Sequence, residues 1–301
     1  MTKFSDVIEE VLSHLYSFGS SRDKVTALSG AITGSVTVLA VDDGKQVDRG
    51  YIEIDQEMIQ VNTVDPSTGT VTLFPFSRGS RGTTAATHLA GAMVTCNPRF
   101  PRNRVAKEIN EVIGSLYPDL FDIALFEGNV VNPSRVTYPL PADTQSIVDV
   151  TFQTTGPSLM WAPVTRYKMD FSADATAFPT GKSLDIYGAM QPGRTMKIRY
   201  RRALVRLVNE TDDMQTVGYI RDEWIDIIRM MVVARLLMSL EPLRLELDAF
   251  ESAARSSQPG GVQPTAATSV AKQLLGFAQL RLASERKELL LRYPSTQVRM
   301  S

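Results

Sequence analysis

The sequence predicts an α+β fold in which a helical frame carries two separate antiparallel β units. Apolar residues recur at helical spacing near both ends and in the middle of the chain, whereas two intervening regions alternate apolar and polar residues. At 301 residues the chain is long enough for two or three structural units. We expect an N-terminal helix over 1–30, a small β-module over 31–98, a connecting helix over 99–129, a β-sandwich over 130–208 and a C-terminal helical region over 209–301.

The composition is typical of a soluble globular protein, with 43% apolar and 22% charged residues. The 32 basic and 33 acidic residues nearly cancel, which argues against a whole-surface grip on nucleic acid and leaves only a local basic patch open. Cys96 is the only cysteine, so an internal disulfide and a cysteine-based zinc site are excluded. With two histidines we expect no metal site, and we expect no cofactor.

Neither a signal peptide nor a membrane span is expected. The N-terminus is acidic within nine residues and lacks a continuous apolar core. The longest apolar-rich run, 225–240, is interrupted by three charged residues and is too short to cross a bilayer. We therefore expect a chain that is made in the cytosol and has no membrane partner.

The first element is an amphipathic helix that stops near Gly19. Its stripe consists of Phe4, Val7, Ile8, Val11, Leu12 and Leu15. A core-facing role is favoured over contact with a neighbouring subunit, because a lone terminal helix must bury its stripe somewhere.

The 31–98 region alternates with a period of two and predicts strands over 35–39, 51–54, 58–64 and 71–74. Turns are expected at 55–57 and at 65–69, where proline and glycine occur. Several short strands joined by tight turns are typical of a small barrel or sandwich. The glycine-rich segment 78–92 then leads into a further strand at Met93 and Val94.

This region resembles a β-module of virion proteins from tailed bacteriophages. Two patterns within 52–94 carry the resemblance: Ile-x-Ile-Asp-x-Glu-x-Ile-x-Val, and Arg-Gly-x-x-Gly-Thr-x-Ala-x-x-His-x-x-Gly-Ala-x-Val. The resemblance points to a structural module of a virus particle rather than to an active site.

A second helix is predicted between Pro98 and Pro118. Pro101 fits its first turn, and Pro118 ends it because the ring disfavours helix at the preceding residue. One stripe runs along it, formed by Val105, Ile109, Val112 and Leu116. The run 100–118 is similar to helices in phage neck and adaptor proteins.

The rest of the chain returns to strands and then to helices. Strands are expected over 135–138, 147–152, 183–187 and 196–200, which favours an antiparallel sandwich. Helices are expected over 219–240, 243–255 and 265–292, with a loop over 258–264. The last helix carries leucines seven residues apart, for which core packing is favoured over a coiled coil: Leu275, Leu282 and Leu289.

No motif for catalysis is present. The chain lacks a phosphate-binding P-loop and a nucleophile elbow. His88 is a conceivable general base, and Asp55 with Glu57 a conceivable carboxylate pair. We expect instead that His88 forms a hydrogen bond within the glycine-rich region and that both carboxylates are solvated in a turn. We assign no catalytic, cofactor or metal residues.

Three charged or aromatic groups offer further candidates. An acidic cluster with the oxygen ligands that hard cations prefer is expected to be solvated surface: Asp42, Asp43, Asp48, Glu53, Asp55 and Glu57. Two basic groups are expected to make subunit contacts rather than bind phosphate: Arg99, Arg102, Arg104 and Lys107; and Lys197, Arg199, Arg201, Arg202 and Arg206. Trp161 and Trp224 are expected to be core anchors rather than sugar-stacking platforms.

The resemblance implies a head-to-tail connector, the adaptor or neck protein of a tailed bacteriophage. It implies a homo-oligomeric, twelvefold ring that docks on the portal protein and contacts a tail or stopper protein, with DNA passing through the lumen. The expected location is the neck of the virion, assembled in the host cytoplasm. Two alternatives remain: a tail or baseplate protein whose sandwich binds carbohydrate, and an enzyme acting on cell-wall polymer.

Overall fold

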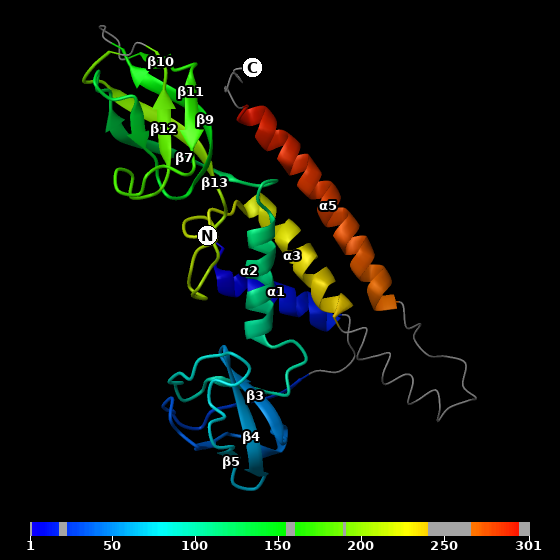
Figure 1. Ribbon diagram of the computed structural model, residues 1–301. Helices are drawn as coiled ribbons and strands as arrows, with labels where there is room; N and C mark the ends of the chain where they lie inside the picture. Colours follow the sequence, from blue (N-terminus) through cyan, green and yellow to red (C-terminus); the bar gives the residue numbers. More distant parts are fainter. Residues whose placement is uncertain (1, 18–22, 155–159, 189–190, 240–265, 295–301) are drawn as a thin grey trace.

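The chain is described by a computed structural model over residues 2–17, 23–154, 160–188, 191–239 and 266–294. Within these residues it has four α-helices and three antiparallel sheets, so the predicted α+β class is confirmed. The helix expected over 243–255 and the loop expected over 258–264 lie outside the described residues. The helices gather between the six-stranded sheet at one end and the two smaller sheets at the other (Figure 1).

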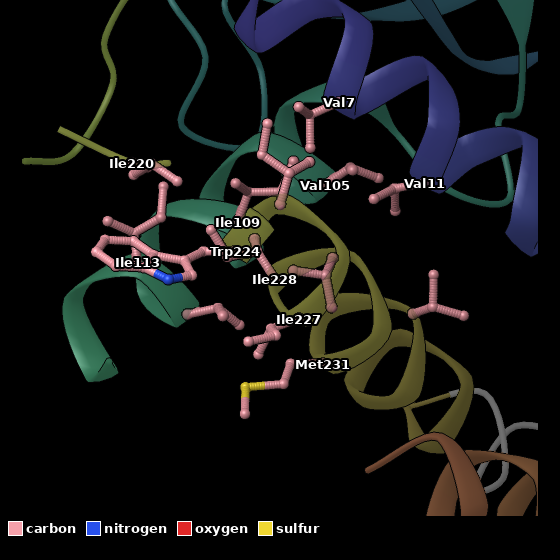
Figure 2. Packing of buried hydrophobic residues seen from close by; sticks show 14 of the residues in the cluster. Val7, Val11, Val105, Ile109, Ile113, Ile220, Trp224, Ile227, Ile228 and Met231 are labelled. Atoms are coloured by element: carbon pink, nitrogen blue, oxygen red, sulfur yellow. The ribbon is translucent and has the colours of Figure 1, made fainter. Parts of the chain in front are cut away.

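The four helices share one hydrophobic core. They are α1 (Phe4–Ser17), α2 (Arg102–Ser115), α3 (Asp222–Met238) and α5 (Ala266–Arg292). All six stripe residues of α1 are buried in this core, which confirms the core-facing prediction. The four stripe residues of the second helix are buried there too. Figure 2 shows side chains of α1, α2 and α3 converging around Ile109 and Ile228.

The two C-terminal helices begin close to where the sequence placed them. Tyr219 has a positive φ of 57° and lies outside α3, which begins at Asp222. Helix α5 packs along α3, with Ala271, Ala278 and Leu289 buried. Leu275 and Leu282 are half-buried against the same core, so the core-packing prediction for the three leucines is confirmed. None of the helices in the described ranges is long and apolar enough to cross a bilayer.

The first β unit is a half-barrel with strand order β1-β6-β3-β4-β5-β2. Its strands are β1 (Lys24–Ala27), β2 (Val38–Ala40), β3 (Gly50–Ile54), β4 (Glu57–Asp65), β5 (Thr70–Leu73) and β6 (Met93–Cys96), with a short 3₁₀ turn η1 (Gly44–Gln46). A bridge between Leu28 and Val41 brings the ends of β1 and β2 together. Strand β1 falls in the range assigned to the N-terminal helix, yet it pairs with β6. The sheet therefore begins before residue 31.

The second β unit consists of two sheets. The four-stranded sheet has the order β10-β9-β13-β7, and the three-stranded sheet has the order β11-β12-β8. Their bounds are β7 (Asp122–Val130), β8 (Thr137–Pro139), β9 (Thr144–Gln153), β10 (Trp161–Pro163), β11 (Tyr167–Asp170), β12 (Ser183–Ile186) and β13 (Thr195–Arg202). One cluster of buried residues draws on both sheets. Strand β7 lies in the range assigned to the connecting helix, but its pairing with β13 makes it part of this unit.

An irregular segment after β13 returns the chain to the helical core. Leu204, Leu207, Met214 and Ile220 are all buried there. A bridge from Lys3 to Asp213 fastens the segment to the start of α1. As a result, residues 208–211 lie against the half-barrel, where the candidate site is found.

Candidate functional site

The glycine-rich segment wraps around one buried carboxylate, that of Glu57 at the start of β4. The side chain of Arg78 donates from Nε and Nη2 to the two carboxylate oxygens at 2.7 and 2.8 Å. The backbone N–H groups of Gly79 and Ala86 donate to the same oxygens at 2.9 and 3.0 Å. Charge-assisted, bidentate bonds of this kind are the strong ones in proteins.

His88 joins this carboxylate to a second one. Its Nε2 lies 2.8 Å from Oε2 of Glu57, and its Nδ1 lies 2.6 Å from Oδ2 of Asp55. Ionised carboxylates only accept hydrogen bonds, so both ring nitrogens donate when both carboxylates are ionised. The imidazole is buried, whereas Asp55 is exposed. The ring of His88 thus bonds to carboxylates at the β3–β4 turn and not to a group within the glycine-rich segment, and both of its nitrogens are occupied.

The environment of Glu57 strongly favours its charged form. Burial by itself raises the pKa, but hydrogen bonds from Arg78, Ala86, His88 and Gly79 outweigh it and lower the pKa to about 2. The expectation of a solvated Glu57 in a turn is therefore wrong. Glu57 begins strand β4 with its side chain facing inward. Hydrogen-bonding groups of residues 78–88 surround its carboxylate.

Glycine is required where the segment wraps around the carboxylate. Gly79 has a φ of +66°, a region that other residues adopt at a cost. A Cβ at this position would lie 3.0 Å from the backbone nitrogen of Ala85 and the carbonyl oxygen of Thr83. Gly79 therefore lets the segment close over Glu57.

A second buried carboxylate, Glu53 of β3, lies at the N-terminus of α2. Pro101 provides no side-chain cap there, and Oε1 of Glu53 instead accepts from the N–H of Asn103 at 3.4 Å. Burial raises the pKa of Glu53 to about 7 against the opposing effect of the helix N–H groups and of Arg102. The half-barrel and the helical core therefore meet at a carboxylate that holds its proton up to near neutral pH.

Arg102 neutralises other carboxylates beside Glu53. Its guanidinium contacts Glu9 of α1 and lies 3.3 Å from Glu210 of the irregular segment. Gln56 also donates to Glu210, at 2.9 Å. The acidic partners of Arg102 thus come from its own chain, and its contact with a neighbouring subunit stays a prediction.

Two cavities flank these charges. A polar one of about 490 Å³ lies between the glycine-rich segment and residues 208–211, and it reaches Asp55, Glu57 and His88. A more apolar groove of about 390 Å³ lies between α1 and strands β1 and β6, with Glu53 and Arg102 among its lining residues. Both are large enough for a small ligand or a protein side chain.

The predicted acidic cluster does not come together. Asp43 caps η1 and Asp48 pairs with Lys24 at 2.6 Å, both on the surface. Glu53 and Glu57 are buried, which corrects the expectation of a wholly solvated cluster. Across the described ranges, no three His, Cys, Asp or Glu residues form a group that could hold a metal ion.

The second basic group is also largely satisfied within the chain. Lys197 lies 2.9 Å from Glu127, Arg199 contacts Asp149, and Arg202 lies 2.7 Å from Asp122. These partners sit on the neighbouring strands of the same sheet, where cross-strand pairs form. Each of these three side chains therefore has an acidic partner within its own chain, and their contact with a neighbouring subunit stays a prediction.

Two further side chains of that group and two of the first contact their own chain as well. The guanidinium of Arg201 donates to the carbonyl oxygen of Tyr293 at 3.1 Å, and that of Arg104 donates to Ser239 at 2.8 Å. The guanidinium of Arg206 lies against Gly114, where an added Cβ would be 3.2 Å from its Nη2. The guanidinium of Arg99 lies over the ring of Phe100.

The two tryptophans differ. Trp224 is fully buried in the helical core, as predicted (Figure 2). Trp161 is in the edge strand β10 and only half-buried, with Nζ of Lys197 4.0 Å from the centre of its ring. The core-anchor prediction is wrong for Trp161, because an edge strand leaves one side of it open.

Sequence reasoning missed Arg78 as the partner of Glu57 and Glu53 as the cap of α2. Only a weak indication in the sequence pointed to Arg78, which is its position directly before Gly79 of the glycine-rich segment. Glu53 had none, because a lone glutamate between two isoleucines normally faces solvent. Comparison with protein-family models and with curated proteins gives no match.

Proposed function

We propose that this chain is a virion structural protein that joins the portal of a phage capsid to the tail as a ring-forming adaptor. One observation carries the proposal: the outer face of α5 presents large apolar side chains that nothing in the described chain covers. A ring of identical copies provides the surface that covers them. The resemblance of residues 52–94 and 100–118 to phage virion proteins supports the same reading.

Of the four exposed large apolar residues in the described part of α5, three lie on one side of the helix. Phe277, Leu280 and Leu291 have 63%, 72% and 73% of their surface exposed. Leu280 follows Phe277 after 3 residues, and Leu291 follows Leu280 after 11. At 3.6 residues per turn, these spacings place the three side chains in one stripe. The opposite stripe packs on α3, so α5 is apolar on both sides. A helix of this kind is expected between two packed surfaces.

The other helices do not add to this excess. The predicted stripes of α1 and α2 and most apolar residues of α3 are buried in the chain's own core. Assembly through helical faces is therefore expected to depend on α5 rather than on the N-terminal helix.

The charge network supports a structural rather than a catalytic role for His88. A general base needs a free ring nitrogen within reach of its substrate. Both nitrogens of His88 contact carboxylates, and Glu57 is held by Arg78 and two backbone N–H groups. The network braces the glycine-rich segment of the half-barrel.

In this proposal the helices form a frame that carries a barrel-like module and a β-sandwich. The ring contacts the portal on one side and a tail or stopper protein on the other. DNA passes through the lumen without sequence-specific binding, which suits the near-zero net charge. The sandwich extends outward or contacts the next ring.

Mass measurement of the purified chain tests the proposal. We expect assemblies of about a dozen copies arranged in a closed ring, since heterologous interfaces close into rings. Electron microscopy of the same sample would show the ring and its lumen. Addition of purified portal should give a larger complex of defined mass. A chain that stays monomeric and ignores portal would refute the proposal.

The alternative of a carbohydrate-binding tail or baseplate protein rests on Trp161. Its ring is half-buried on an edge strand, but Lys197 lies over its ring. A stable monomer that binds glycans, and loses this binding in Trp161→Ala, would favour that alternative. Hydrolysis of cell-wall polymer that is abolished by His88→Ala would favour the enzyme reading instead.

A further inference from the structure

Phe76 is the most exposed large apolar side chain in the described part of the molecule. Its surface is fully open to solvent, and it lies in the turn that follows β5. Its φ of +59° is a conformation that bulky residues rarely adopt. An aromatic side chain held outward by an unfavourable backbone suggests an anchor for another surface.

The turn that carries Phe76 is held in place by the buried network. Arg78 follows two residues later and is fixed by Glu57 and by the carbonyl oxygens of Thr33 and Ala86. Ser77, between the two, donates its N–H to the carbonyl of Phe74 at 3.2 Å. Phe76 is therefore presented in a fixed position, which lowers the entropy lost on binding.

The apolar groove between α1 and the β1–β6 edge is a suitable receptor for such a side chain. Leu12, Val25, Met93 and Phe100 are among its apolar lining residues. Val25 and Met93 are about half exposed, so the groove is open and its apolar lining is uncovered. Its volume of about 390 Å³ accommodates an aromatic ring.

The charges around the two features are complementary. The groove is lined by the carboxylates of Glu9 and Asp23 and by the single guanidinium of Arg102, which Glu9 and Glu210 already neutralise. Beside the Phe76 turn, Arg49 lies over the ring of Phe74 at 5.6 Å. Arg49 is exposed and forms no ion pair with the residues that the structure describes. Opposite charges of this kind orient two partners and set their register.

We propose that Phe76 of one copy inserts into the groove of the next copy, with Arg49 facing Glu9 and Asp23. This inference rests on the proposed ring and names one contact that builds it. Anchor and receptor are different surfaces of one chain, so the contact is heterologous and propagates from copy to copy until the ring closes. A single aromatic anchor in an apolar pocket is typical of an interface hot spot.

Mixing two defective variants tests this contact. Phe76→Ala removes the anchor and Val25→Lys blocks the receptor, while each leaves the other surface intact. Each variant alone should associate about 30-fold more weakly, the loss expected for one hot-spot residue. An equimolar mixture should form heterodimers, because the intact anchor of one variant meets the intact receptor of the other. Native mass spectrometry reads out all three samples.

Matched controls separate this contact from general damage. Phe171→Ala makes the same substitution at another exposed phenylalanine, which belongs to the other β unit, and should leave assembly unchanged. Met93→Lys blocks the receptor at a second position, should Val25→Lys fail to fold. If Phe76→Ala forms rings as readily as the wild type, this inference is overturned but the proposed function is not. A wild-type chain that never assembles overturns the proposed function as well, and a mixture that gives no heterodimer contradicts the anchor-and-groove contact.

Discussion

Glu53 and Glu57 are four residues apart and both buried, yet their pKa values move in opposite directions. Glu57 has its pKa lowered to about 2 because a guanidinium, an imidazole and two N–H groups surround it. Glu53 has its pKa raised to about 7 because burial dominates over weak contacts with the start of α2. The number and quality of donors, rather than burial itself, decide which form is stable.

Removing the guanidinium partner of Glu57 should destabilise the half-barrel. We expect Arg78→Met to lower the free energy of unfolding by about 3–5 kcal/mol, as is typical when one member of a buried ion pair is lost. Urea denaturation measures this effect. The control Lys168→Met removes an exposed charge of β11 and should change stability by less than about 0.5 kcal/mol. An equal effect of both substitutions would contradict the structural role of the network.

Glu53 predicts a loss of stability as the pH rises. Its carboxyl titrates near 4.5 when unfolded and near 7 when folded, so between these values the folded state holds the extra proton. Its contribution is fully present below about pH 4.5 and declines as the pH rises through 7. Glu53→Gln should abolish this decline and stabilise the protein at pH 8 by up to about 3 kcal/mol.

Thermal unfolding of the Glu53→Gln variant at pH 5 and pH 8 checks the sign. Glu57→Gln is the matched control, because its folded pKa is depressed and its stabilisation is present above pH 4.5 and lost toward pH 2. It should therefore destabilise at both values. If Glu53→Gln stabilised the protein by the same amount at pH 5 and pH 8, the raised pKa of Glu53 would be disproved.

At the scale of elements, α5 combines a packed inner face with a glycine at its middle. Gly276 is in the helix interior, and a Cβ placed there meets no atom within 4 Å. Gly276→Ala should therefore raise the free energy of unfolding by about 1 kcal/mol, from helix propensity alone. Gly69→Ala is the contrasting control, since its Cβ would lie 2.2 Å from the carbonyl oxygen of Val41 and its φ is +69°. It should destabilise, and chemical denaturation distinguishes the two.

The outer face of the same helix should govern assembly rather than folding. Leu280→Lys places a charge in the exposed apolar stripe and should reduce the ring population at least about tenfold, with the melting temperature unchanged. Gln273→Lys adds the same charge at an exposed position where no apolar side chain is lost. If both variants assemble like the wild type, α5 is not an interface.

At the scale of the whole molecule, the described residues of this one chain form three separate clusters of buried apolar side chains. The helical cluster draws on α1, α2, α3, α5 and the irregular segment after β13, so it closes only when both ends of the chain return to it. Each β unit has its own cluster. We therefore expect the half-barrel to hold its structure when the helical core loosens, and amide hydrogen exchange should give the two regions different opening free energies.

Periodicity determined most of the elements. The stripe of α1, the stripe of α2, the strands β4, β5, β9, β12 and β13, and the heptad leucines of α5 all follow from spacing that burial in the chain's own core then satisfies. Strands β1, β7, β10 and β11 were not predicted. Each is an edge strand with few buried residues, so the alternation of its apolar and polar residues is weak.

The amino-acid sequence alone determined the fold class, the positions of the main helices and the place of the glycine-rich segment. Only the tertiary structure decided which carboxylates are buried and what they bind. Arg78 is 21 residues from Glu57, Asn103 is 50 residues from Glu53, and Arg102 meets Glu9 and Glu210 from opposite ends of the chain. The physical reason is that a buried charge is stabilised by donors brought close in space, and periodicity along the chain carries no record of those distances.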